Sequence, residues 1–258
     1  MNTTNSKERN LKTALQLLHN AVAKQAKFII LPETFNYRGP DEEIRNQAET
    51  VSGPTMQVLK RFARQHAVWI LGGSIFETTG VGKKVYNTSV IIKPNGIIQA
   101  LYRKIHLFGV RWGTMNIQES TSVIAGRKPS LVNVMGERVG LSICYDLRFP
   151  ELYRYYSNQG ARILCVPASF TYKTGKDHWE ILLKARAIEN QCYVLAANRC
   201  GVDSNGSRAY GHSMIVDPWG KVVVRAGGDT SRVIVADLDM SLVLEVRHRL
   251  PALRHRVL

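Results

Sequence analysis

The sequence predicts an α/β protein, a four-layer αββα sandwich in which two sheets lie between two layers of helices. Helix-like segments alternate with groups of strand-like runs along the chain of 258 residues. The strand-like runs are almost continuously apolar, which is typical of sheets that are covered on both faces. In addition, "FIILPETF" and "ILCVPASF" both consist of an apolar strand, a proline, two further residues and a phenylalanine. This similarity indicates two related halves, each with a strand and a flanking pair of helices.

Two helices and six strands are expected up to Cys144. Lys7–Ala26 carries apolar residues at helical spacing, and Pro54–His66 begins with a proline, which suits the first turn of a helix. Between them, the apolar run Phe28–Phe35 is expected to be a strand that Pro32 ends. Asn95-Gly96 is a strong hairpin signal. Further strands are expected over residues 68–76, 87–93, 97–104, 130–134 and 138–144.

The second half of the chain is predicted to contain three helices and five strands. Pro150–Asn158 is helix-like, and Gly160 suits the left-handed conformation that follows a helix. Asp177–Glu180 resembles a capping box that opens a helix over residues 178–191. Met240–Arg249 is also expected to be helical. The strand-like runs are residues 162–170, 192–201, 210–220, 221–227 and 232–239.

Length and composition favour one ordered domain over residues 1–258. Hydrophobic residues make up 45% and charged residues 21% of the chain, as in globular proteins, and no low-complexity linker interrupts it. The first residues, "MNTTNSKERNLKT", contain no apolar core of a signal peptide. No uncharged apolar run approaches the roughly 20 residues that cross a bilayer. We therefore expect a cytoplasmic protein without a membrane partner.

The charge is strongly basic. The formal net charge is +15, from 35 Lys and Arg against 20 Asp and Glu. Such an excess fits nucleic acid, an anionic substrate or simply a basic surface. The basic residues are spread along the chain, apart from a cluster within residues 247–258, and they form no ribbon with interleaved aromatic residues that could stack bases. Nucleic acid is therefore not expected to be the main partner.

The four cysteines point to a reducing compartment. Cys144, Cys165, Cys192 and Cys200 form no C-x-x-C pair and no dense disulfide framework. Their spacings match none of the usual zinc knuckles, so no metal site is predicted.

Three reactive side chains each follow a strand-like run. Glu33 follows "FIILP", Lys104 follows "IIQALYR" and Cys144 follows "RVGLSI". Ligands gather at strand ends in α/β proteins, because the loops converge there on a rigid sheet. Taken singly, Glu33 has an ordinary explanation as a loop cap, Lys104 as a solvated strand end and Cys144 as a small core residue. Together they form a combination that can do chemistry.

The combination suits nucleophilic attack on an amide or nitrile carbon. A cysteine thiol is only a few per cent ionised at neutral pH and needs a base to accept its proton. Glu33 could be that base if it lies in a closed pocket that raises its pKa. Lys104 and the backbone N–H that follows Cys144 could stabilise the negative oxygen of the tetrahedral intermediate.

Three segments also resemble a known family. "LPETF", "YRKIHLF" and "GLSICYDLRFPELY" are similar to the three signature segments of the nitrilase (carbon–nitrogen hydrolase) superfamily and occur in the same order. "HWEILLKARAIENQCYV" and "YGHSMIVDPWG" resemble the branch that contains the Nit-type ω-amidases and deaminated glutathione amidases. The resemblance implies an αββα sandwich that hydrolyses non-peptide C–N bonds, such as the ω-amide of a dicarboxylic or α-keto acid, through a thioester. It implies neither a metal nor an organic cofactor.

The resemblance also implies roles for individual residues. Cys144 would be the nucleophile, Glu33 the general base and Lys104 the oxyanion stabiliser. Glu119, in "QESTSV", would orient Lys104, or it is an ordinary loop carboxylate. Tyr145 would contribute its backbone N–H to the oxyanion hole.

Four further positions would line the substrate pocket. The resemblance assigns this role to Tyr37, Arg148, Phe170 and Thr174, which would help to hold a substrate carboxylate. A guanidinium suits that task because it binds a carboxylate with two hydrogen bonds. A structural ion pair is an equally open explanation of Arg148.

Two features depart from the family pattern. The chain begins with "MNTTNSKERN", where members of the family usually carry an apolar strand, so the first strand is expected to be missing and a sheet edge to be unpaired. The segment after "YRKIHLF" reads "GVRWGTMNIQES", with Arg111 and Trp112 in place of the usual acidic residue and Pro-Gly. This second difference is expected to alter the size and charge of the pocket.

Other functions remain open at this stage. The chain could be a nitrilase or an N-carbamoyl amine hydrolase of the same superfamily, or an inactive basic binding module on that scaffold. His106, His178 and His212 could suggest a papain-like Cys-His pair, but we expect them to be structural. The C-terminal segment "RHRLPALRHRVL" resembles the tail through which the family assembles, so a homodimer or higher homo-oligomer is expected.

Overall fold

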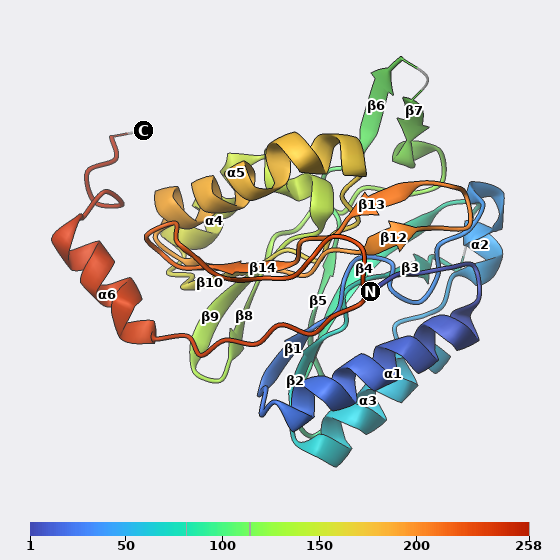
Figure 1. Ribbon diagram of the computed structural model, residues 1–258, viewed down its shortest axis with the longest axis horizontal. Coiled ribbons are helices and arrows are strands. Elements are labelled where there is room, and N and C mark those ends of the chain that lie inside the picture. Colours follow the sequence, from blue (N-terminus) through green and yellow to red (C-terminus); the bar gives the residue numbers. More distant parts are fainter. Residues whose placement is uncertain (81, 114, 258) are drawn as a thin grey trace.

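The computed structural model, which describes residues 1–80, 82–113 and 115–257, has two sheets lying face to face (Figure 1). Helices α1 (Lys7–Ala23) and α3 (Pro54–His66) cover the outer face of the first sheet. Helices α4 (Pro150–Asn158) and α5 (Tyr172–Asn190) cover the outer face of the second. The predicted four-layer αββα sandwich is confirmed.

The first sheet has five strands in the order β1-β2-β4-β3, and β5 pairs with β4. β1 runs parallel to β2, with Ile29 opposite Ile70, and the other pairs are antiparallel. The hairpin between β4 and β5 contains Asn95-Gly96, as predicted, and Gly96 adopts a positive φ of 79°. The strands are β1 (Phe28–Ile30), β2 (Trp69–Leu71), β3 (Ile75–Thr78), β4 (Val85–Ile92) and β5 (Ile98–Arg103).

The second sheet has six strands in the order β15-β14-β11-β10-β9-β8. Its centre is the parallel trio β9, β10 and β11, and every residue of β10 and β11 is buried. This burial explains their uninterrupted apolar sequences. The strands are β8 (Ser130–Val134), β9 (Glu137–Leu141), β10 (Ile163–Cys165), β11 (Tyr193–Ala196), β14 (Met214–Val216) and β15 (Val222–Arg225).

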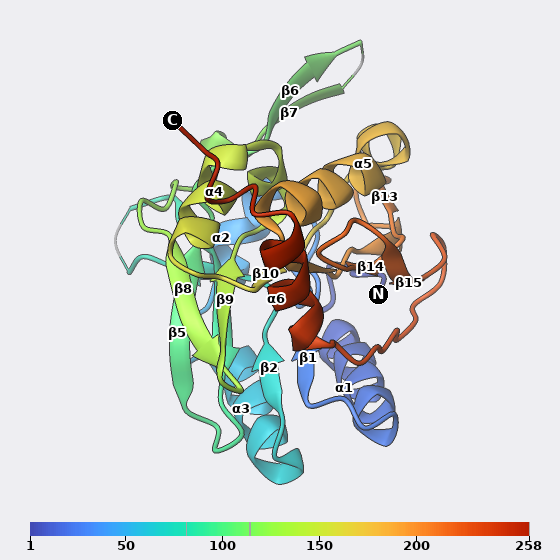
Figure 2. The same cartoon turned by 90° about the vertical axis from the view of Figure 1, so that its left-hand side faces the viewer.

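Smaller elements decorate the sandwich. The hairpin of β6 (Gly109–Trp112) and β7 (Met115–Gln118) projects from the body in both Figure 1 and Figure 2. β12 (Cys200–Val202) and β13 (Arg208–Tyr210) form a separate antiparallel pair, which lies between β11 and β14 in the sequence. α6 (Met240–Arg249) lies beyond the sandwich, near the C-terminus. The remaining short helices are α2 (Ile44–Gln47) and the 3-10 turns Asp41–Glu43, Glu119–Thr121 and Cys144–Arg148.

Helix ends follow local signals where such signals exist. α1 begins after Ser6, whose side chain accepts a hydrogen bond from the Arg9 N–H. α3 and α4 begin with Pro54 and Pro150. Proline has no backbone N–H, but N–H groups in the first turn of a helix have no partner within the helix, so no hydrogen bond is lost there. α6 has the predicted bounds, whereas α1 ends three residues earlier than expected, at Ala23.

Two apolar cores hold the layers together. One lies between the first sheet and its helices and includes Leu18, Leu59 and Ile70, each fully buried. The larger core fills the space between the two sheets and beneath α4 and α5, and it includes Tyr102 and Trp179. Packing of this kind fixes the sheets rigidly, so the loops at their strand ends are held in place.

The expected start of α5 is wrong. The helix begins at Tyr172, so Asp177 lies within it rather than at a capping box. Its first turns pack closely on the body, since a Cβ added to Gly175 would lie 2.4 Å from a side-chain atom of Tyr210. Tertiary packing therefore stabilises this end of the helix, where the sequence pattern gave no helical signal.

The strand expected over residues 232–239 is also wrong, because the segment is extended but joins no sheet. As the sequence indicated, residues 1–6 contain no strand either; among the described residues β1 pairs with β2 alone and is the edge of the first sheet. An apolar sequence alone does not make a sheet strand, because a neighbouring backbone must also be available to pair with it. Across the described ranges, no helix is both long enough and apolar enough to traverse a bilayer.

Candidate active site

The structure brings Glu33, Lys104, Glu119 and Cys144 together at the ends of strands from both sheets. The Lys104 Nζ lies 2.9 Å from Glu33 Oε1 and 2.8 Å from Glu119 Oε2. The Cys144 thiol and the Glu33 carboxyl group lie close enough to shift each other's pKa. An ammonium group therefore sits between two carboxylates, one of which also contacts the thiol.

Local backbone geometry fixes the position of Glu33. Pro32 ends the extended run after β1, and its carbonyl oxygen lies only 2.0 Å from where a Cβ of Gly73 would be. Gly73 has a φ of 49°, so both its conformation and its close approach favour glycine. The Thr34 N–H donates to Ser74 Oγ at 2.9 Å. These contacts hold the loop that presents the carboxylate.

Cys144 occupies a sharp turn after β9. Its φ of 49° lies in the left-handed region, which is uncommon for a residue with a side chain. Its N–H donates to the Pro167 carbonyl oxygen at 2.9 Å, and the 3-10 turn Cys144–Arg148 starts there. The abrupt end of the strand thus turns the sulfur out of the sheet and towards the cavity.

Burial and charge set the protonation states. Burial alone would lower the pKa of Lys104, but the carboxylates of Glu119 and Glu33 outweigh burial and hold that pKa well above its usual value. Burial alone would raise the pKa of Glu33, but the charge and hydrogen bond of Lys104 prevail and lower it. Burial and the nearby Glu33 charge raise the pKa of the Cys144 thiol. The resting thiol is therefore protonated beside an ionised carboxylate that can accept its proton.

These side chains face one cavity of about 90 Å³. Most of the residues expected at the site line it, and so do several that the sequence reasoning did not identify. The lining includes Glu33, Arg38, Asn87, Lys104, Phe108, Glu119, Cys144, Tyr145, Arg148, Ser169, Phe170 and Thr174. A cavity of this size accommodates a small molecule.

Arg148 lies free of a carboxylate partner in the described ranges. Its guanidinium carbon lies 5.3 Å from the centre of the Phe170 ring, and its terminal nitrogens lie 3.3 Å from His178 Nδ1. The structural ion pair considered for Arg148 is thus not observed. The guanidinium remains able to bind an anion in the cavity.

Tyr37 does not line the cavity, contrary to expectation. Its side chain is fully buried, and its hydroxyl donates to Glu43 Oε2 at 2.9 Å. Although it is close to Glu33 in sequence, it packs in an apolar cluster with Ile44 and Phe76, which line the cavity, while Tyr37 itself lies behind them. It supports the loop rather than the substrate.

Sequence reasoning missed Asn87 and Ser169. The Asn87 Nδ2 donates to Glu33 Oε1 at 2.9 Å and lies 3.3 Å from Glu119 Oε1, so this amide links the two carboxylates. The Ser169 backbone N–H lies close enough to the Cys144 thiol to counteract part of the rise in the thiol pKa. The only available signal for Asn87 was a polar residue within an otherwise apolar strand.

The histidines have structural partners. His106 contacts Asp146, His178 contacts Arg148, and His212 Nδ1 lies 2.8 Å from the Tyr210 carbonyl oxygen. None of them is among the cavity-lining residues. Within the described ranges, no three His, Cys, Asp or Glu side chains gather in a way that could hold a metal ion.

Comparison with known proteins gives a consistent picture. Residues 1–248 match the family model described as carbon–nitrogen hydrolase. The chain is 44% identical to a deaminated glutathione amidase of Synechocystis sp. over 96% of this chain and 92% of that protein. It is 36% identical to the omega-amidase NIT2 of Homo sapiens, covering 97% and 90% of the two chains. The structure of the C. elegans NitFhit protein is similar with a TM-score of 0.92 and 37% identity, over 100% of this chain and 63% of that one.

Proposed function

We propose that this chain, which belongs to the carbon–nitrogen hydrolase family, hydrolyses an ω-amide. Its substrate would be the ω-amide of a small dicarboxylic or α-keto acid, or of deaminated glutathione. The products would be a carboxylate and ammonia, or an amine from an N-substituted amide. The observation that carries the proposal is the ammonium of Lys104 held between Glu33 and Glu119 beside the Cys144 thiol. The names of the amidase relatives support the choice of an amide.

The first step is attack on the amide carbon. Glu33 accepts the thiol proton while the Cys144 sulfur forms a bond to the carbonyl carbon, and the carbonyl oxygen becomes negative. Lys104 and the Tyr145 backbone N–H stabilise this oxygen. Glu119 keeps Lys104 charged and oriented, because its two oxygens lie 3.1 and 2.8 Å from Nζ.

The second step expels ammonia. The protonated Glu33 gives its proton to the amide nitrogen, the C–N bond breaks, and a thioester remains on Cys144. Water then attacks the thioester carbon while Glu33 accepts a proton from it. The C–S bond breaks, the sulfur regains the proton, and the free carboxylic acid leaves. One amide and one water thus yield one acid and one ammonia.

Arg148 is the proposed binding group for the distal carboxylate of the substrate. It lines the same cavity as the thiol and packs over Phe170, so its position is defined without a protein carboxylate. A guanidinium in this setting can form two parallel hydrogen bonds with a carboxylate. Phe170 and Thr174 would complete this end of the pocket.

We also propose a cellular location, a domain organisation and an assembly for this chain. All four cysteines are free and buried, which suits the cytoplasm. The two sheets share one core, which suits a single domain over residues 1–258. A homodimer or higher homo-oligomer would use the face of α4, where Tyr155 is exposed. Neither nucleic acid nor membrane is a proposed partner.

An ammonia-release screen tests the function. The panel contains ω-amides of dicarboxylic acids, matched amides whose distal carboxylate is replaced by a methyl ester, and the corresponding nitriles and carbamoyl amines. We expect turnover of the ω-amides, its loss in Cys144→Ala, and a rise of KM for carboxylate substrates alone in Arg148→Gln. Preferential turnover of nitriles or carbamoyl amines, or no turnover at all, would overturn the proposal.

A further inference from the structure

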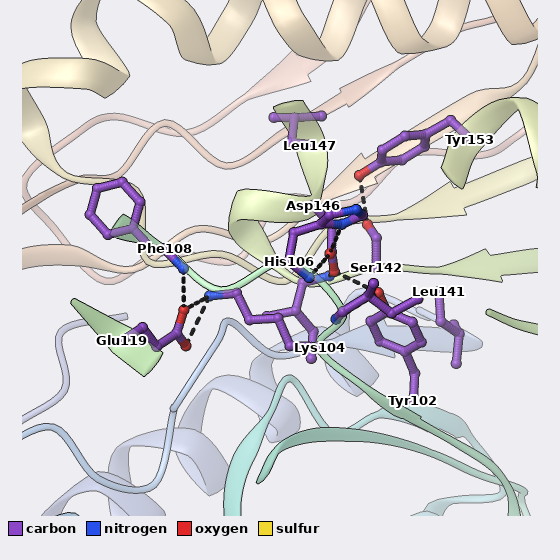
Figure 3. A network of polar contacts seen from close by, with 12 residues as sticks. Tyr102, Lys104, His106, Phe108, Glu119, Leu141, Ser142, Asp146, Leu147 and Tyr153 are labelled. Atoms are coloured by element: carbon purple, nitrogen blue, oxygen red, sulfur yellow. Dashed lines mark hydrogen bonds and ion pairs between the residues drawn. The ribbon is translucent and has the colours of Figure 1, made fainter. Parts of the chain in front are cut away.

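One buried carboxylate lies between the two segments that carry Lys104 and Cys144. Asp146 is fully buried and accepts four hydrogen bonds (Figure 3). Its Oδ2 accepts the Tyr102 hydroxyl at 2.7 Å and the Ile143 N–H at 2.8 Å. Its Oδ1 accepts the His106 N–H at 3.0 Å and lies 2.7 Å from the His106 ring Nδ1. These four bonds use the acceptor sites of a carboxylate.

The donors flank the reactive residues along the chain. Tyr102 and His106 lie two residues before and two residues after Lys104. Ile143 directly precedes Cys144, and Asp146 itself lies two residues beyond it. A single carboxylate therefore connects both sides of Lys104 to both sides of Cys144, although the two segments come from different sheets.

The His106 ring is held on its other side as well. It stacks on Phe149 with ring centres 3.8 Å apart and planes 7° apart. Phe149 follows the nucleophile turn and contacts the Tyr145 ring edge-on, with centres 5.4 Å apart. The ring thus packs against the nucleophile turn while its Nδ1 reaches Asp146. Because it does not line the cavity, it does not touch the substrate.

We propose that Asp146, with Tyr102 and His106, forms a positioning clamp that sets the distance between the Lys104 ammonium and the Cys144 sulfur. The inference rests on the proposed function, since it concerns the alignment of the attacking sulfur with the group that stabilises the oxyanion. Misplacement of a catalytic group by about 1 Å can reduce a rate by about 10²-fold. Loss of the clamp should therefore lower kcat. KM should remain unchanged, because Arg148 and the rest of the substrate pocket are not altered.

Two tyrosines provide a matched comparison. Tyr102→Phe removes a buried hydroxyl that donates to Asp146. Tyr153→Phe removes an equally buried hydroxyl that donates to Ser142 Oγ at 2.8 Å in the same core, without contacting the Lys104 segment. Tyr102→Phe also removes the acceptor of the Ile105 N–H at 3.4 Å, so the Tm values of the two variants are compared to measure the structural loss separately from the loss of kcat.

Substitutions of His106 separate its donor from its ring. His106→Asn retains a side-chain N–H near the position of Nδ1 but loses the stacked ring. His106→Phe retains the ring against Phe149 but has no donor for Asp146. The clamp predicts that the asparagine variant is the active one, whereas a simple packing role predicts the reverse.

The experiment measures kcat and KM for ammonia release, the rate of Cys144 alkylation by iodoacetamide, and Tm for all four variants. We expect kcat to fall about 10- to 100-fold in Tyr102→Phe and His106→Phe with KM within about 2-fold, and to remain within about 3-fold of the parent in Tyr153→Phe and His106→Asn. Alkylation rates should follow the same order. Equal losses in the two tyrosine variants, or a lower kcat in His106→Asn than in His106→Phe, would overturn the clamp.

The outcomes separate this inference from the proposed function. If the parent protein releases ammonia from no amide, the proposed function fails, but the alkylation rates still compare the alignment of Cys144 in the four variants. If one variant does not fold, the other matched pair decides. Equal alkylation rates across the four variants would count against the clamp in either case.

Discussion

Lys104→Met should destabilise the protein strongly near pH 7 and much less near pH 4.5. The methionine keeps the apolar stem but removes the ammonium that lies within 3 Å of both Glu33 and Glu119. Removing one partner of a buried ion pair costs about 3–5 kcal/mol, because a charge is left without compensation. For a chain of this size, that corresponds to a decrease in Tm of roughly 6–20 °C.

The pH dependence follows from the pKa of Glu33. In the parent protein this pKa is lowered, so the stabilising contribution of Glu33 is complete above the ordinary value of 4.5 and is lost only as the pH falls below it. In the variant, no ammonium opposes burial, so burial raises the pKa of Glu33 and the folded state holds a proton at pH values where the unfolded chain has lost it. Each such pH unit is worth 1.36 kcal/mol, so the range from the ordinary value of 4.5 up to pH 7 accounts for at most about 3.4 kcal/mol of the deficit. Most of the deficit should therefore disappear at the lower pH.

Urea unfolding followed by tryptophan fluorescence at the two pH values measures this difference. Lys184→Met is the matched control, because Lys184 forms an exposed ion pair with Glu180 one helical turn away. Exposed pairs contribute about 0.3–0.5 kcal/mol, so this control should change little at either pH. An equal deficit of Lys104→Met at both pH values would refute the charge argument and would indicate lost packing instead.

Three further outcomes are expected. Glu33→Gln should lower ammonia release by at least about 10²-fold with an unchanged circular dichroism spectrum, because an amide cannot accept the thiol proton; near-normal turnover would mean that another group is the base. Intact-protein mass spectrometry after brief iodoacetamide treatment should show one added group, at Cys144, since the other three cysteines do not line the cavity; comparable labelling elsewhere would argue against a selectively accessible thiol. Gly175→Ala should lower Tm even though alanine favours helices, because its Cβ would lie 2.4 Å from Tyr210; a rise in Tm would show that this packing relaxes easily.

Local signals explain what could be predicted from the sequence. Pro54 and Pro150 mark helix starts by their chemistry, and α3, α4 and α6 have the predicted bounds. The reactive residues at strand ends could be selected because Glu33, Lys104 and Cys144 each follow an apolar run directly. The family resemblance added Glu119, which lies outside any such run.

What could not be predicted depends on contacts between distant segments. The start of α5 depends on the packing of Gly175 against Tyr210, and the segment 232–239 joins no sheet despite its apolar run. The direction of a loop side chain is equally non-local, so the family resemblance that assigns Tyr37 to the pocket could not be checked from the sequence. Asn87 was missed because a polar residue in a strand does not indicate which groups it will meet across the sandwich.

The left-handed backbone at Cys144 has a further consequence. Holding a side-chain-bearing residue at a φ of 49° costs of the order of 1 kcal/mol, and glycine would relieve that expense. The protein therefore retains a strained backbone conformation at its proposed nucleophile. Replacing the cysteine with glycine should relieve this backbone strain and remove the thiol. The variant should be inactive and suited to binding an uncleaved ligand for crystallography.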